Sequence, residues 1–294
     1  MPRLARIKGD GEVFYHLCNK IAGKKNEFPL SEDKKASRKF VDFIHFYGEA
    51  YQCEIVSFVV MGNHYHLIVQ FEEFQELTEK QLYKIAQKFY PNTHEFTKEW
   101  DEAQWERFNN RIYDVSEFMR NVQMGFSKWY NKTYQRKGRL WAERFKSVIL
   151  TDEKSILNCM QYIELNPVRA GIIKSNRPED YEYSSLYMRD IKLDYWLKDL
   201  TVLMEESDHK SALQKYKAMV YYRGGVRSKE GQKEIPESVI EQVERENFES
   251  KRVFMKKLRF YSDGLIIGTE ELISEWLGKL RDKVVFKRRI NLIT

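Results

Sequence analysis

The sequence predicts an α+β fold in which helices cover the faces of one antiparallel sheet, with a helical C-terminal extension. Three observations predict it: short β-branched and aromatic runs, longer amphipathic runs with helical spacing, and the order in which the two kinds alternate. That order is strand, helix, strand, strand, helix, strand, and a further helix follows the fourth strand. It is the ferredoxin-like or RRM-like pattern, which hosts many unrelated functions.

Each element has its own signature. Phe40, Phe43, Ile44 and Tyr47 recur at helical spacing and indicate the first helix. Thr151 or Asp152 is suited to cap the helix after the fourth strand. The strands are expected at 13–22, 52–61, 64–70 and 145–150, and the helices at 31–50, 115–134 and 152–165.

Two segments lie outside this pattern. Residues 72–114 are polar, rich in aromatics and helical in propensity, and they are expected to form an insertion. After about residue 190 the pattern is helical, which divides the chain into a catalytic-type domain at 1–190 and an extension at 191–294. Helices are expected there at 191–221, 236–261 and 269–282, with a linker at 222–226.

Composition narrows the classes of function. The chain has 294 residues, of which 42% are hydrophobic and 32% charged, enough for a substantial core beneath an ionic surface. Its three scattered cysteines do not suggest a disulfide framework or a clustered-cysteine zinc site. No apolar run approaches the length of a membrane span, and the start lacks the apolar stretch of a signal peptide. We therefore expect a cytoplasmic protein without a membrane partner.

The net charge of +6 is unevenly distributed. Segment 132–174 holds nine Lys/Arg and four Asp/Glu, and segment 251–294 holds eleven and five. Segment 71–114 is acidic, with ten Asp/Glu and six Lys/Arg. Local basic concentration favours a polyanionic partner, although a solvated charged surface would also produce it.

His64 and His66 lie on the expected third strand, immediately after the break at Gly62 and Asn63. Side chains two apart in a strand point to the same face, so the two imidazoles project together. Neutral imidazole is a common ligand for divalent metals. The pair predicts half of a metal site; the alternative is two ordinary hydrogen-bonded histidines.

Tyr162 and Asn166 share a face of the expected helix 152–165, beside its apolar stripe. Pro167 is expected to end the helix and to leave the Asn166 amide at an exposed helix end. An ordinary half-buried tyrosine and a polar C-terminal residue are the alternative. With the histidines, however, the amide completes three possible metal ligands, and the tyrosine could attack a phosphorus centre that the metal polarises.

Basic residues before that helix are candidates for phosphate contacts. Arg144 and Lys146 alternate on the expected strand and would share a face, and Arg139 precedes them. Trp141 and Phe145 are expected in the core. Three other residues are not expected in the site: His16 and His45 as ordinary histidines, and Glu164 because it points away from Tyr162.

Several motifs together resemble one family. Residues 64–66 (HYH) look like the HUH motif of single-tyrosine transposases, and 162–171 (YIELNPVRAG) is similar to the nucleophile helix of REP-associated tyrosine transposases. Residues 138–147 (GRLWAERFKS) resemble that family's Gly-x-Leu-Trp-x-x-Arg-Phe-Lys-Ser stretch. The opening residues 1–3 and 15–16 also match. The resemblance covers about residues 1–190, and 260–271 is similar to the tail of longer members.

The resemblance implies a mechanism and a set of roles. Tyr162 would be the nucleophile that forms a 5′-phosphotyrosine link and frees a 3′-hydroxyl. His64, His66 and Asn166 would bind Mg²⁺ or Mn²⁺. The substrate would be single-stranded DNA with imperfect hairpins, and rejoining would need no ATP. The basic residues expected to contact DNA are Arg139, Arg144, Lys146 and Arg169.

Two departures from the family pattern and two alternative functions accompany this expectation. The family usually has Pro where this chain has Gly62, and the insertion at 72–114 is longer than usual. A hairpin DNA- or RNA-binding module of RRM-like fold that does not cleave is one alternative. A replication or conjugation nickase is another, although such proteins more often carry paired tyrosines or helicase domains. The oligomeric state, monomer or homodimer, and the cis or trans placement of Tyr162 both stay open.

Overall fold

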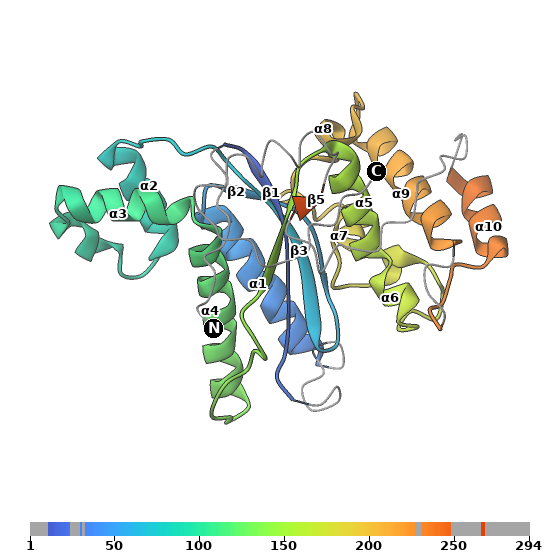
Figure 1. Cartoon of the computed structure of the whole chain (residues 1–294), viewed down its shortest axis with the longest axis horizontal. Helices are drawn as coiled ribbons and strands as arrows, with labels where there is room; N and C mark the ends of the chain where they lie inside the picture. Colours follow the sequence, from blue (N-terminus) through green and yellow to red (C-terminus); the bar gives the residue numbers. More distant parts are fainter. Residues whose placement is uncertain (1–10, 24–29, 31–32, 227–230, 248–265, 268–294) are drawn as a thin grey trace.

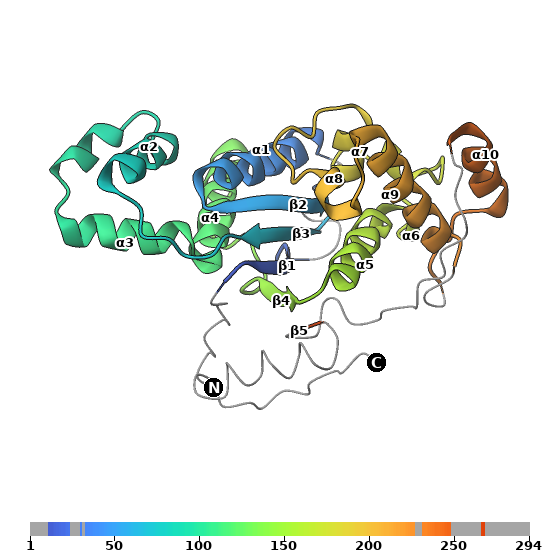
Figure 2. The ribbon, with the colours of Figure 1, turned by 90° about the horizontal axis from the view of Figure 1, so that it is seen from above.

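One five-stranded sheet organises the molecule. The computed structural model describes residues 11–23, 30, 33–226, 231–247 and 266–267. The strand order across the sheet is β2-β3-β1-β4-β5, and Figures 1 and 2 show helices on both sides of it. The strands are β1 (Val13–Lys20), β2 (Cys53–Val60), β3 (His64–Phe71), β4 (Lys146–Leu150) and β5 (Ile266–Ile267).

The first four strands pair antiparallel, which confirms the predicted α+β class and its antiparallel sheet. β1 lies between β3 and β4. The two strands that flank each crossover helix are therefore separated by one other strand: β3 lies between β1 and β2, and β1 lies between β3 and β4. The sequence did not predict β5, which pairs parallel with β4 at the sheet edge.

Two long helices cover one face of the sheet. They are α1 (Lys34–Ala50) and α4 (Val115–Thr133), and the Asp33 and Asp114 side chains cap their first turns. The Tyr65 ring of β3 lies 4.9 Å from the Phe40 ring of α1, and its hydroxyl accepts a hydrogen bond of 2.8 Å from Gln123 of α4. Odd-numbered β3 side chains therefore enter this core, which leaves the even-numbered ones for the opposite face.

Helix α5 (Glu153–Glu164) lies on that opposite face (Figure 2). Asp152 caps it by accepting a hydrogen bond of 2.7 Å from the Ser155 backbone N–H, as the sequence predicts. The expected apolar stripe is buried, and it consists of Ile156, Cys159, Met160 and Ile163. The buried stripe fixes the rotation of α5 about its axis, which sets where Tyr162 lies.

The expectation that Pro167 leaves Asn166 at an exposed helix end is wrong. A short helix, α6 (Asn166–Arg169), follows α5 directly, and its first turn contains the proline. Proline is tolerated in a first turn because its missing N–H would have no partner in the helix there. The chain keeps turning, so Asn166 is half-buried and Arg169 lies one turn later.

The predicted insertion is a helical unit with its own aromatic core. It comprises α2 (Glu79–Phe89), η1 (His94–Glu99) and α3 (Glu102–Ile112). The Phe89 ring lies 5.6 Å from Phe108 within the unit and 5.1 Å from Tyr51 at the end of α1. Figure 1 shows α2 and α3 at the opposite end of the molecule from α9. The insertion therefore extends the core beyond α1 and α4, away from α5.

The C-terminal helices pack on the other end. They are η2 (Pro178–Asp180), α7 (Ser185–Asp190), α8 (Leu200–Met204), α9 (His209–Gly224) and α10 (Glu237–Asn247). The predicted continuous helix over 191–221 is wrong, because 191–199 is irregular and pairs with β2 through the Lys198 N–H and the Ile55 carbonyl. Segment 222–226 is not a linker throughout, since α9 continues to Gly224.

Some predicted features lie outside the described residues. They include residues 1–3, the expected helix 269–282, the part of the expected helix 236–261 after residue 247, and segment 260–271 apart from 266–267. Among the described residues a single hydrophobic core runs from Val13 to Val243. The boundary drawn at residue 190 stays a prediction, and the packing across it is continuous.

Candidate functional site

The two histidines of β3 lie where the strand pattern places them. The chain reverses at Gly62 and Asn63, and β3 begins at His64. Their rings lie 5.3 Å apart between centroids and nearly perpendicular. His66 is buried, with 6% exposure, whereas His64 is half-buried. The pair therefore occupies one face of the sheet, at the end of β3 where solvent reaches it.

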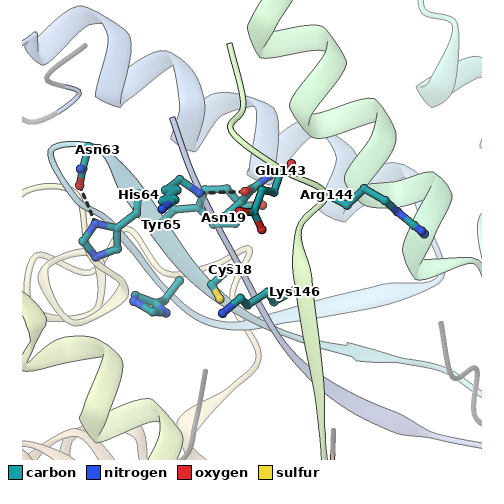
Figure 3. Close-up of a pocket in the computed structure, with 10 residues that line it drawn as sticks. Cys18, Asn19, Asn63, His64, Tyr65, Glu143, Arg144 and Lys146 are labelled. Atoms are coloured by element: carbon teal, nitrogen blue, oxygen red, sulfur yellow. Dashed lines mark hydrogen bonds between the residues drawn. The ribbon is translucent and has the colours of Figure 1, made fainter. Parts of the chain in front are cut away.

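Both imidazoles use Nδ1 for a hydrogen bond within the protein. His64 Nδ1 lies 2.9 Å from the Asn63 side-chain oxygen, and this bond is drawn in Figure 3. That oxygen can only accept, so His64 Nδ1 carries the proton. His66 Nδ1 lies 3.0 Å from His16 Nε2. When His66 donates in this bond, both β3 histidines keep Nε2 as the nitrogen with a lone pair, which is the arrangement of orienting partners behind metal-bound histidines.

His16 is a site residue that sequence reasoning missed. It lies on β1, is fully buried and stacks on His66 with ring centroids 5.2 Å apart. Burial first, and then the neighbouring His16 and His64, hold the pKa of His66 well below its usual range. His66 is therefore neutral at physiological pH. Strand alternation predicts that His16 faces α5, but only the antiparallel register places it beside His66.

Tyr162 of α5 reaches the same face of the sheet. Its ring centroid lies 5.5 Å from that of His66 and 6.4 Å from that of His16. Burial, and then Cys159 and Cys18, raise the pKa of Tyr162 to about 12, while Arg169 and Asn166 act in the opposite direction. The structure thus brings together residues about a hundred positions apart, and the tyrosine is protonated at neutral pH.

Asn166 and Arg169 follow Tyr162 at the end of α5 and in α6. The Asn166 amide nitrogen donates to the Tyr162 carbonyl over 2.8 Å and more weakly to that of Ile163. Its carbonyl oxygen is the atom suited to bind a cation. The Arg169 guanidinium lies 6.0 Å from the Tyr162 ring centroid, within the range of a cation–π contact. Tyr162 therefore lies between the histidines and an arginine.

A cavity of about 310 Å³ opens beside the histidines. Cys18 of β1 pairs in register with His66 on one side and Lys146 on the other, so all three share one face. Lys146 points toward Cys18, whereas Arg144 extends away from His64 (Figure 3). His66 lines this cavity and also contacts Tyr162, so it separates the cavity from the tyrosine.

The basic candidates do not form one cluster. β4 begins at Lys146, so Arg144 precedes the strand and the expected alternation of these two side chains does not apply to it. Both still line the cavity and are exposed. Arg139 is exposed in the preceding loop and does not line the cavity. Arg169 lies apart from them, on the α5 side.

Glu164 points away from the site, as the sequence predicts. Its carboxylate bonds to the hydroxyls of Ser57 and Ser185, on the side where α5 meets β2 and α7. Burial raises its pKa to about 7. Among the described residues, no three His, Cys, Asp or Glu side chains converge as metal ligands. A cation at the histidines would therefore need an oxygen from a residue of another type, such as Asn166, or from the substrate.

Trp141 and Phe145 are buried, which confirms their predicted place in the core. The three cysteines, Cys18, Cys53 and Cys159, are buried and free. No helix in the described ranges combines the length and apolar character needed to cross a bilayer.

The fold and the site together define a class: an α+β protein whose β3 strand presents two histidines on the face of the sheet that carries the tyrosine of α5. A curated protein of Haemophilus influenzae (strain ATCC 51907 / DSM 11121 / KW20 / Rd), named "Putative REP-associated tyrosine transposase", is 24% identical over 151 residues. The match spans 51% of this chain and 68% of that protein. It confirms the resemblance to REP-associated tyrosine transposases that the motifs predict.

A solved structure described as a REP-associated tyrosine transposase bound to a REP hairpin also aligns with this chain. The alignment covers 66% of this chain and 88% of the other, at 16% identity and a TM-score of 0.44. A scan against protein-family models matches none.

Proposed function

We propose that this protein is a metal-dependent single-stranded DNA endonuclease and strand transferase that recognises hairpin DNA and cleaves through a 5′-phosphotyrosine intermediate. The observation that carries the proposal is the position of Tyr162, 5.5 Å from His66 and 6.0 Å from the Arg169 guanidinium, measured to the tyrosine ring centroid. A nucleophile, two metal-ligand side chains and a cation for phosphate thus meet at one end of the sheet. The similarity to a curated transposase supports the same class.

In the proposed reaction the Tyr162 hydroxyl oxygen attacks a backbone phosphorus. A bond forms between the tyrosine oxygen and the phosphorus, and the bond from phosphorus to the 3′-oxygen breaks. The phosphate stays on the 5′ end of the downstream strand. The phenolic proton is lost to water and the departing 3′-oxygen takes one up, so atoms and charges balance. The phosphotyrosine keeps the energy of the broken ester. Attack by a 3′-hydroxyl on this link would rejoin a strand without ATP.

His64 and His66, with the Asn166 side-chain oxygen, would hold Mg²⁺ or Mn²⁺. The donor chemistry fits, because His66 is held neutral and both Nδ1 atoms are engaged, which leaves Nε2 toward the site. A divalent ion bound there would polarise a phosphate oxygen. Within the protein, Asn63 and His16 would hold the two imidazoles in orientation.

Basic side chains on two elements would hold the DNA backbone. Lys146 and Arg144 line the cavity beside the histidines, Arg169 lies next to Tyr162, and exposed Arg139 lies in the loop before them. Contacts of this kind neutralise phosphates and make binding sensitive to salt. A strand passing from the cavity over His66 to Tyr162 would meet both groups.

The decisive experiment is adduct formation. Full-length protein is incubated with Mn²⁺ and single-stranded DNA that carries an imperfect palindromic hairpin, and the products are separated under denaturing conditions. We expect a covalent protein–DNA adduct that disappears on chelation and in Tyr162→Phe, while Tyr90→Phe in the insertion serves as the matched control. An adduct that forms equally well in Tyr162→Phe would refute the nucleophile assignment, and unchanged Mn²⁺ affinity in His64→Ala would refute the metal site.

The second candidate is a hairpin-binding module that does not cleave. The observation favouring it is the raised pKa of Tyr162, about 12, because a protonated phenol is a weak nucleophile. Such a module would show salt-dependent binding by Arg139, Arg144 and Lys146 but no denaturant-resistant adduct under any metal condition.

A further inference from the structure

The end of α9 lies against the end of α5. Gly224, the last residue of α9, has no room for a side chain, because a Cβ there would lie 2.4 Å from the Ile235 side chain and 2.9 Å from that of Leu165. A larger residue would push the two helix ends apart. Arg223 immediately precedes this glycine, so the close contact sets its position relative to α5.

Arg223 is anchored on the face of α5 that carries Tyr162. Its Nη1 atom donates to the Asn158 side-chain oxygen over 2.6 Å. Asn158 lies one helical turn before Tyr162 and is 1% exposed. The Asn158 Nδ2 atom is buried and has no hydrogen-bond partner among the described residues. A buried donor without a partner is costly, so it indicates an acceptor that the described residues do not supply.

Arg169 approaches the same place from α6. Burial, and then the charge of Arg223, lower the pKa of Arg169 to about 10, whereas Tyr162 acts in the opposite direction. In the described part of the chain no carboxylate lies within 4 Å of either guanidinium. Two partly buried arginines therefore lie beside the Tyr162 face of α5, Arg169 at the tyrosine ring and Arg223 at Asn158, and neither has a carboxylate partner among the described residues.

We propose that Arg169 and Arg223 together bind one phosphate of the nucleic-acid strand beside Tyr162, with the Asn158 amide as a further donor. Helix α9 of the C-terminal extension thereby contributes directly to the site. This inference rests on the proposed function for the identity of its substrate, but the phosphate site itself can be tested by binding alone.

The chemistry of the three groups suits a phosphodiester. Guanidinium groups match phosphate oxygens with paired N–H donors, and the amide adds one more. A bound anion would also offset the electrostatic repulsion between the two guanidinium groups. Lysine at either position would keep the charge but lose the fork of donors.

The first test measures the salt dependence of binding to a thymidine oligonucleotide by fluorescence anisotropy. We expect the double variant Arg169→Gln and Arg223→Gln to lower the slope of log affinity against log salt by about 0.7, the value for one phosphate contact on a single strand, and each single variant to lower it by part of that amount. Lys210→Gln removes a charge from the same helix about 20 Å away and should leave the slope unchanged. An unchanged slope in folded Arg223→Gln would overturn the proposal.

The second test needs no variant and covers the case in which Arg223→Gln does not fold. Arginines of the parent protein are modified with phenylglyoxal, with and without saturating oligonucleotide, and the peptides are quantified by mass spectrometry. Arg169 and Arg223 should be protected several-fold, whereas exposed Arg107 in α3 should react equally in both samples. Equal reaction of Arg223 with and without oligonucleotide would overturn the inference.

The two proposals can fail separately. If the parent forms no covalent adduct but Arg223→Gln still lowers the salt slope, the proposed cleavage is wrong and the phosphate site stands. If the adduct forms and Arg223→Gln changes neither the slope nor the rate, the phosphate site is wrong and the cleavage stands.

Discussion

The insertion at 72–114 and helix α9 are both additions to the sheet and its three covering helices, yet they relate to Tyr162 in opposite ways. The insertion packs beyond α1 and α4, and Figure 1 shows α2 and α3 at the far end of the molecule. Helix α9 lies against α5, and Arg223 bonds to Asn158 on that helix. One addition is remote from the candidate site, whereas the other forms part of its wall.

Their charges are also organised differently. In the insertion, cations are paired with nearby anions, as in Lys98 with Glu95, and Arg111 with Glu117 at the start of α4. The side chains of Arg169 and Arg223 instead contact a tyrosine ring and an amide, respectively. Paired surface charges contribute little to stability or recognition. Two partly buried arginines without a carboxylate partner among the described residues favour an anionic ligand.

The largest expected effect is on the pH dependence of stability, and it concerns Glu164. This residue lies where α5 meets the C-terminal helices. Its folded-state pKa of about 7 exceeds the usual 4.5, so its contribution to stability is complete below pH 4.5 and is lost as the pH rises through 7. Relative to Glu164→Gln, the parent should lose about 3 kcal/mol of unfolding free energy over that range, as measured by urea titration of both proteins. Glu164→Gln should remove this slope, whereas Glu117→Gln at the insertion end should keep it.

The next prediction uses the protonation of Tyr162. With a pKa of about 12, the phenolate fraction grows about tenfold with each pH unit, so adduct formation should rise about 100-fold from pH 7 to pH 9. Single-turnover rates with Mn²⁺ measure this. A plateau near pH 8 would contradict the prediction, because it would require a much lower pKa in the complex with DNA.

His16 should affect metal binding without being a ligand. His16→Ala removes the partner of His66 Nδ1 and should weaken Mn²⁺ binding about tenfold to a hundredfold, as is usual for such orienting contacts. His16→Gln can still accept the hydrogen bond and should recover part of this loss. His94→Ala in the insertion is the matched control, and isothermal calorimetry measures all three. Equal affinity in His16→Ala would show that the contact does not orient His66.

The smallest effect is expected in the insertion. The double variant Lys98→Glu and Arg107→Glu should change oligonucleotide affinity less than about twofold, because charges separated by more than a Debye length are screened. Anisotropy at 0.15 M salt measures it. A loss comparable to that of Arg223→Gln would place the insertion on the nucleic acid and remove the contrast between the two additions.

Local patterns predicted most of the fold around the site. Alternation and apolar spacing placed β1 to β4, α1, α4 and α5 within a few residues, because each element buries one face and its sequence records that face. The same reasoning failed at Pro167, where α6 continues the turning, and at 191–199, where the chain pairs with β2. At 191–199 a tertiary hydrogen bond to β2 accompanies the irregular conformation, whereas at Pro167 the proline is accommodated in the first turn of α6.

The sequence by itself identified the candidate site residues. They are His64 and His66 on one strand face, and Tyr162 and Asn166 on one helix face, and the spacing along each element predicts that face. Only the tertiary structure decided what these residues meet. The antiparallel register placed His16 behind His66, and the close contact at Gly224 brought Arg223 to the Tyr162 face. Neither follows from spacing along the chain, because both depend on how separate elements pack across long sequence distances.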